Sequence, residues 1–204
     1  MPGKVCSLIL FLFVMLVSAQ ASAEGNGPLR IARIPMIVQS GYHLSQETVD
    51  KLEVKLDRAL HIPLNGVLHR VEYLPEEKCV AALEDVLGEL RREGRRVKLK
   101  DAMKPLAERL GADLVVCPVI EYYSQYVYMG GFWRSGTILH SNVGIALMGY
   151  EGRTGKPFSE SESRFYHSDY STWGLAEVLA GECMDKVIDR TGVHYMARGE
   201  DRNS

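Results

Sequence analysis

Residues 106–123 read LAERLGADLVVCPVIEYY, and this stretch decides the fold of the chain. Segment 114–120 is apolar throughout, which is typical of a strand that is covered on both faces. A short helix is predicted over 105–110, and Gly111 ends it because glycine readily adopts the left-handed conformation of a helix C-cap. We therefore predict a helix, a tight turn and then a central strand.

Strand and helix patterns continue on both sides of this stretch. Alternating apolar residues predict strands over 31–41 and 67–74, and helical spacing predicts helices over 45–60 and 75–90. Strands over 137–151 and 157–167 flank the turn residues GRTGK, and Ser171 can cap a closing helix over 172–190. The expected fold is α/β (α+β), with a single mixed sheet of about five strands in the order β-α-β-α-α-β-β-β-α, a C-terminal antiparallel meander and a closing helix.

The N-terminus has the pattern of a secretory signal peptide. One Lys precedes an apolar run over 5–17, and small residues follow up to Ala23. We predict a cleaved signal peptide over 1–23, a single domain over 24–198 and a disordered tail over 199–204. The only Cys of the leader, Cys6, is not at the cleavage point, so we expect an exported protein of the periplasm or cell surface that is not lipid-anchored.

The net charge restricts the possible partners, and the number of cysteines restricts the possible disulfides. The formal net charge of −2 provides no basic field for nucleic acid, which we exclude as a partner. Cleavage of the leader leaves Cys79, Cys117 and Cys183, all among apolar residues. They are either three buried thiols or one disulfide with one unpaired Cys.

Several of these segments together resemble a known bacterial family. The resemblance rests on LAERLGADLVVCPVIEYY, on the later strand GIALMGYEGRTGKPFSE and on the closing helix. It is to the envelope family that includes the curli-secretion channel protein, the penicillin-binding-protein activator lipoprotein and the N-terminal domain of the Tol periplasmic protein. The resemblance implies a non-enzymatic α/β module of the bacterial envelope that binds partners or assembles into rings.

No motif predicts catalysis, a cofactor or a metal ion. The segment YHSDYST contains His167, Ser168 and Asp169, the residue types of a hydrolase triad, but a strand that ends at a helix cap explains the same residues. None of the six histidines has the i, i+4 spacing of a helical zinc site. We predict that the protein is not an enzyme and keep a secreted hydrolase as the competing class.

The stretch YYSQYVYMGGFWRSG, residues 122–136, holds six of the 17 aromatic residues. Tyr and Trp are frequent at binding hot spots and at membrane interfaces. The predicted partner-binding residues are Tyr126, Tyr128, Phe132 and Trp133. Ordinary packing and membrane-surface contact remain alternatives.

A second, weaker candidate is the basic run that contains Arg91, Arg92, Arg95 and Arg96, which could contact an anionic surface or form a solvated loop. The leading hypothesis is a non-catalytic envelope module that binds an envelope protein, or self-assembles into a homo-oligomer, through an aromatic hairpin. The alternative within the same resemblance is an oligomeric secretion or channel component.

Overall fold

The structure is a computed structural model and describes residues 27–39, 44–92, 97–130 and 136–200. One mixed sheet forms its centre, in the order β3-β1-β4-β5-β6 with β2 beside β4. β1, β2 and β3 run parallel to their neighbours, and β4, β5 and β6 form an antiparallel meander. The strands are β1 (Leu29–Arg33), β2 (Ile37–Val38), β3 (Val71–Tyr73), β4 (Leu114–Met129), β5 (Thr137–Glu151) and β6 (Lys156–Asp169).

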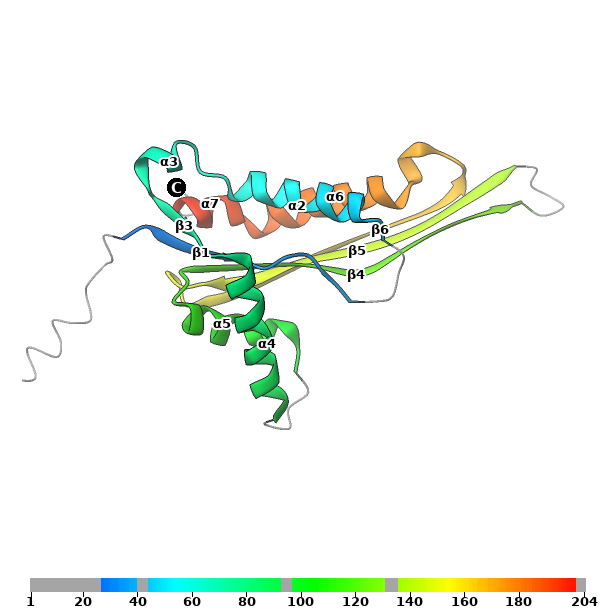
Figure 1. Cartoon of the computed structure of the whole chain (residues 1–204). Coiled ribbons are helices and arrows are strands. Elements are labelled where there is room, and N and C mark those ends of the chain that lie inside the picture. The colour runs from blue at the N-terminus through cyan, green and yellow to red at the C-terminus, as the bar shows by residue number, and fades with distance from the viewer. Residues whose placement is uncertain (1–26, 40–43, 93–96, 131–135, 201–204) are drawn as a thin grey trace, which may run out of the picture.

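Helices cover both faces of the sheet in the part that contains β1 and β3 (Figure 1). One layer contains α2 (Gln46–Leu60), α6 (Ala176–Thr191) and α7 (Val193–Arg198), and the opposite layer contains α4 (Glu76–Arg92) and α5 (Met103–Leu110). The short elements are α3 (Asn65–Leu68), η2 (Leu99–Ala102) and η3 (Thr172–Gly174). Each helix layer has its own apolar core against the sheet, so the central strand is buried on both faces as predicted.

The predicted fold class is confirmed, with two local differences. The first predicted strand is divided into β1 and β2 around Pro35. The predicted strand over 67–74 is wrong in its first half, where the chain forms α3. The side chain of Asn65 exchanges two hydrogen bonds with the backbone of Val71, at 2.7 and 2.8 Å, and this holds the turn against the start of β3.

Gly149 of β5 leaves room for atoms of the two neighbouring strands of the sheet. A Cβ atom on Gly149 would lie 1.9 Å from the carbonyl oxygen of Val115 on β4 and 2.5 Å from the ring of Phe158 on β6. No side chain fits in this space, so the Phe158 ring lies over the glycine and completes the core on the α6 side.

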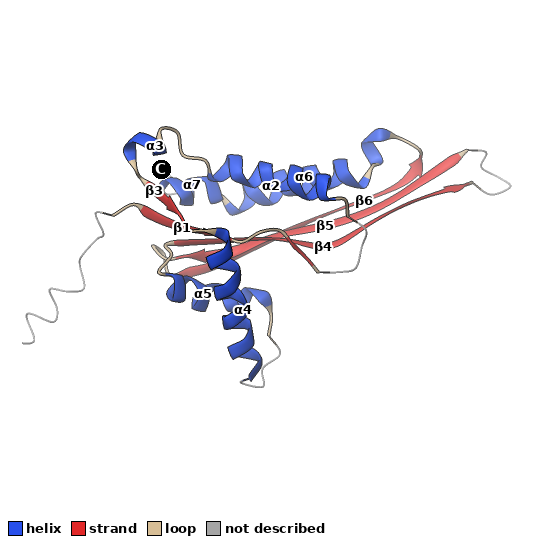
Figure 2. Cartoon of the chain, viewed as in Figure 1, coloured by secondary structure: helices blue, strands red, loops and turns tan. Residues whose placement is uncertain are grey.

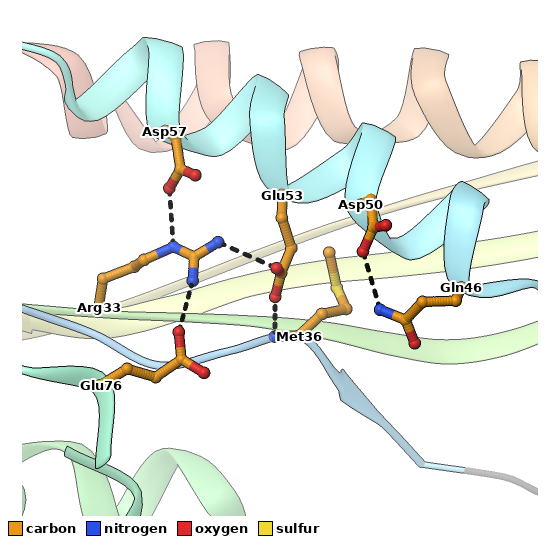
Figure 3. A network of polar contacts seen from close by, with 7 residues as sticks. All are labelled: Arg33, Met36, Gln46, Asp50, Glu53, Asp57 and Glu76. Atoms are coloured by element: carbon orange, nitrogen blue, oxygen red, sulfur yellow. Dashed lines mark hydrogen bonds and ion pairs between the residues drawn. The ribbon is translucent and has the colours of Figure 1, made fainter. Parts of the chain in front are cut away.

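An ion-pair network joins β1 to helices from both layers (Figure 3). The side chain of Arg33 is only 17% exposed and lies 3.3 Å from Glu53 and 2.8 Å from Asp57 of α2, and 3.5 Å from Glu76 of α4. Glu53 also accepts a hydrogen bond of 2.8 Å from the backbone N–H of Met36. The guanidinium group thus fixes the position of both helices relative to the sheet.

The three cysteines Cys79, Cys117 and Cys183 are buried free thiols. Of the two alternatives from the sequence, three thiols or one disulfide with an unpaired Cys, the structure has the first. Burial raises the pKa of Cys117 to about 12 and that of Cys183 to about 11. Neither thiol ionises near neutral pH, so both act as small apolar core residues. None of the helices in the described ranges combines the length and apolarity of a membrane-spanning segment.

Candidate functional site

The strands β4, β5 and β6 continue beyond the helices on the α4–α5 side of the sheet (Figure 2). β4 is buried at every position of 114–120, whereas its last five residues, 125–129, are all exposed. A β-bulge lies between Ile120 and Tyr122, where these two parts of the strand meet. The outer part of β4 is therefore a structurally distinct segment that contributes little to the core.

The strand register shows which side chains share the uncovered face. Ala146 and Met148 of β5 pack in the core beneath α4 and α5. Since side chains two residues apart share a face of a strand, His140 lies on the same side. Tyr126 of β4 and His167 of β6 are its direct partners across the sheet. These three side chains form one row on a face that carries no helix among the described residues.

Five ring side chains gather on this face, and we call them the aromatic surface: Tyr126, Tyr128, His140, Phe165 and His167. The rings of Tyr126 and His140 are stacked, with centroids 4.3 Å apart and an interplanar angle of 20°. His140 meets Phe165 edge to face at 5.0 Å, and Phe165 is nearly parallel to His167 at 6.1 Å.

Exposure distinguishes this surface from the core. Phe165 is 63% exposed, Tyr126 is 52% exposed and Tyr128 is 41% exposed. Contiguous exposed apolar patches are typical of interaction sites on folded proteins, so this surface is a candidate site. Tyr170 and Trp173, which follow β6, are also exposed.

The polar atoms of the aromatic surface contact one another. Nδ1 of His140 lies 3.2 Å from Nδ1 of His167, and the Tyr128 hydroxyl lies 3.4 Å from Nε2 of His167. Because an imidazole nitrogen donates only when it carries a proton, one histidine donates and the other accepts across the first contact. The rings of His140 and His167 are thus held by polar contacts with side chains on other strands.

The outer edge of β4 is a second feature of the same region. β1 and β2 pair with β4 at 114–116 and at 119–120, and Gln39 donates a last backbone hydrogen bond to Ile120. In the described part of the chain no strand pairs with this edge of β4 beyond that point. Residues 122–129 carry no charge, although charged residues are the usual protection of an exposed strand edge. The segment can accept a further strand.

The structure places only part of the predicted binding residues. Tyr126 and Tyr128 lie on the aromatic surface, whereas Phe132 and Trp133 lie outside the described residues. Sequence analysis missed Phe165 and the pairing of His140 with His167. The alternation of Phe165, His167 and Asp169 along one strand indicated a shared face, but nothing in the sequence gave the register across three strands.

The remaining candidates are separated in space. His167 and Ser168 are consecutive residues of β6 and therefore face opposite sides of the sheet, which does not suit a catalytic pair.

Arg91 and Arg92 of the basic run are exposed in the last turn of α4, where positive charges interact favourably with the negative end of the helix dipole. The other two, Arg95 and Arg96, lie outside the described residues, as does the predicted signal peptide.

Two hollows elsewhere are lined by charges that pair with one another. One, of about 350 Å³, borders the Arg33 network. The other, of about 480 Å³, contains Arg190 2.8 Å from Glu162, and Arg164 3.4 Å from the same carboxylate. Among the described residues no group of three or more His, Cys, Asp or Glu side chains is arranged to hold a metal ion. The aromatic surface is therefore the strongest candidate site.

No family model matches the sequence, and no curated protein matches it. Several solved structures are similar in fold. The lipoprotein GNA1162 from Neisseria meningitidis is 17% identical, with a TM-score of 0.38 over 81% of this chain and 99% of that one. A dodecamer of PelC from Paraburkholderia phytofirmans is 13% identical, with a TM-score of 0.41 over 80% of this chain and 88% of that one.

The C-terminal domain of LpoB from Salmonella enterica is also similar, at 13% identity and a TM-score of 0.30 over 73% of this chain and 92% of that one. The resemblance to bacterial envelope proteins is confirmed, and at these identities it is a likeness of fold alone. The expectation that the chain is not lipid-anchored is contradicted, because lipoproteins such as GNA1162 are among the similar structures. The position of Cys6 in the sequence was an insufficient basis for that expectation.

Proposed function

We propose that the chain is a non-catalytic module of the bacterial envelope that binds another envelope protein through its aromatic surface. The observation that carries this proposal is the exposure of Tyr126, Tyr128 and Phe165 beside one another on a sheet face without a helix cover. Large, stiff aromatic side chains lose little conformational entropy on binding and are enriched at interface hot spots. The rest of the domain then acts as a rigid support for this surface.

Charge favours a protein partner over a lipid surface. The described residues on this face of the outer strands include Ser124, Asn142 and Asp169 beside the rings, and none of them is Lys or Arg. Binding to an anionic membrane draws on basic residues near the surface, each contributing about 1 kcal/mol. The mixture of aromatic rings with neutral and acidic polar groups suits a protein interface better.

The free edge of β4 supports the same proposal. A partner segment in extended conformation could pair with the backbone of 122–129 while its side chains contact the adjacent rings. Backbone pairing would provide affinity, and the aromatic surface would provide specificity. Tyr126 and Tyr128 belong both to this edge strand and to the aromatic surface, so one partner can use both features.

Photo-crosslinking in the native cell tests the proposal. A photoreactive amino acid replaces Phe165, and in a control chain it replaces Val67, which is 77% exposed in α3 and lies far from the aromatic surface. We expect a discrete protein adduct from position 165 and none from position 67. An adduct with a second copy of the chain would identify self-assembly in place of a different partner. The same adducts from both positions, or none from 165, would reject the proposal.

A further inference from the structure

We propose that His140 and His167 form a binding site for a divalent transition-metal ion such as Zn²⁺ or Cu²⁺. The two residues are direct cross-strand partners on β5 and β6, and their Nδ1 atoms face each other at 3.2 Å. This inference concerns the two imidazole rings and does not depend on the proposed protein partner.

The separation of the two nitrogen atoms matches that of two ligands of one ion. Imidazole nitrogen binds Zn²⁺ at about 2.0–2.1 Å, so two such ligands at a tetrahedral angle lie roughly 3.3 Å apart. The observed 3.2 Å corresponds to an angle slightly below tetrahedral, and no change of strand register is needed. Imidazole is a preferred ligand of both Zn²⁺ and Cu²⁺.

A neighbouring hydroxyl group supports the required protonation state. A histidine that binds a metal through one nitrogen usually has its other N–H hydrogen-bonded to a polar group, which fixes the ring. The Tyr128 hydroxyl oxygen lies 3.4 Å from Nε2 of His167 and is placed to accept a hydrogen bond from the N–H group at that atom. In that tautomer the Nδ1 atom of His167 accepts from His140 in the metal-free chain. Binding of the ion replaces this hydrogen bond, and the His140 ring then carries its single proton on Nε2, so that both Nδ1 lone pairs are available to the metal.

The site has two protein ligands and open coordination positions. No third His, Cys, Asp or Glu within the described ranges completes it. His167 is exposed and His140 is half-buried, so water or a donor atom from another molecule can occupy the remaining positions. Its affinity is thus expected to be moderate, and higher for Cu²⁺ than for Zn²⁺, as the general order of divalent affinities requires.

No metal site was predicted from the sequence, because no two histidines have the spacing of a helical zinc site and residues sharing one strand face, such as His167 and Asp169, were interpreted as solvated. His140 and His167 are 27 residues apart. Only the antiparallel pairing of β5 with β6 brings them together, so no short sequence motif marks this site.

Calorimetric titration of the full chain, purified without a histidine tag, with ZnCl₂ and CuCl₂ tests this inference. The variants are His140→Gln and His167→Gln, since glutamine keeps a polar side chain without an imidazole ligand. His61→Gln, an exposed histidine after α2, is the matched control. Circular dichroism of each variant verifies the fold.

We expect the wild-type chain and His61→Gln to bind one ion at this site. Each of the other two variants should weaken binding by more than about tenfold, since even loss of an outer-shell partner typically weakens a metal site 10–100-fold. The electron paramagnetic resonance spectrum of bound Cu²⁺ should show two coordinated imidazole nitrogens and lose that signature in either variant. Equal affinities for wild type and both variants, or no binding by the wild type, would overturn the inference.

Discussion

Replacement of Phe165 by Ser separates a binding role from a structural one. Phe165 is 63% exposed in the free chain. A phenylalanine side chain offers roughly 200 Å² for burial, so about 125 Å² remains available to a partner. At about 25 cal/mol per Å², its burial in a complex contributes about 3 kcal/mol, which corresponds to about a 100-fold change in Kd.

The cost of the same substitution to the fold should be small. In the free chain the ring contacts His140 on β5 and His167 two residues further along β6. Pairs of neighbouring side chains on a sheet face contribute roughly 0.2–1 kcal/mol each. A loss of about 1 kcal/mol lowers the midpoint of thermal unfolding by about 2–4 °C in a domain of this size. Phe165→Ser is therefore expected to fold normally and to bind its partner poorly.

The assay measures both quantities on the same chains. A photoreactive residue at Tyr126 reports the yield of the partner adduct in the Phe165→Ser background, and thermal unfolding reports stability. At a partner concentration that occupies half of the chains with Phe165, a 100-fold weaker Kd leaves about 1% of the Phe165→Ser chains occupied. Val67→Ser, which alters an exposed side chain in α3, should leave the yield unchanged. An undiminished yield in Phe165→Ser, or a midpoint lower by more than about 10 °C, would refute the reasoning.

Three further predictions concern the fold. Gly149→Ala should destabilise the domain by about 1–3 kcal/mol or more in urea unfolding, because its Cβ would lie 1.9 Å from the Val115 carbonyl oxygen; an unchanged midpoint would contradict this packing. Because burial raises the pKa of Cys117 to about 12, its thiol ionises first in the unfolded chain, and the unfolding free energy should fall by about 1.4 kcal/mol per pH unit between about pH 9 and 11. Cys117→Ala should lack that part of the decline, and equal slopes would exclude this origin. Arg33→Gln should cost about 1–3 kcal/mol, since it leaves the half-buried Glu53 carboxylate without its cation; a chemical-unfolding midpoint equal to that of the wild type would argue against the network.

Local patterns were sufficient to predict most of the fold. The apolar run at 114–120 required cover on both faces, and Gly111 takes a positive φ of 59° at the end of α5, as its position in the sequence predicts. The prediction failed at 67–70, where alternation is compatible with a strand. The side-chain hydrogen bonds of Asn65 and the positive φ angles of Leu64 and His69 form a helical turn there. A pattern of alternating apolar and polar residues carries no information about such hydrogen bonds between a side chain and the backbone.

The candidate site was less predictable because it is assembled across strands. Tyr126 and Tyr128 could be identified from an unusual local density of aromatic residues. The contribution of Phe165 depends on its register against Asn142 of β5, which is set by a turn more than ten residues away. A slip of one residue would have moved Phe165 to the α6 side of the sheet. Sequence analysis therefore found one strand of the aromatic surface and missed the other two.

The residue types along β6 favour the proposed binding role of the aromatic surface. Ser159, Ser161 and Ser163 occupy one face of the inner part of this strand, and Phe165 and His167 continue the same face outward. All five residues are exposed, so solvent contact alone does not explain the change from serine to ring side chains. The inner residues follow the usual rule that an exposed edge strand is polar, and the outer ones depart from it. Ring side chains replace serine on β6 only where the neighbouring β4 and β5 also carry rings on this face. Each contact between two of these rings contributes little stability by itself. Burial against another molecule, as proposed, would give these side chains a contribution that the isolated domain does not provide.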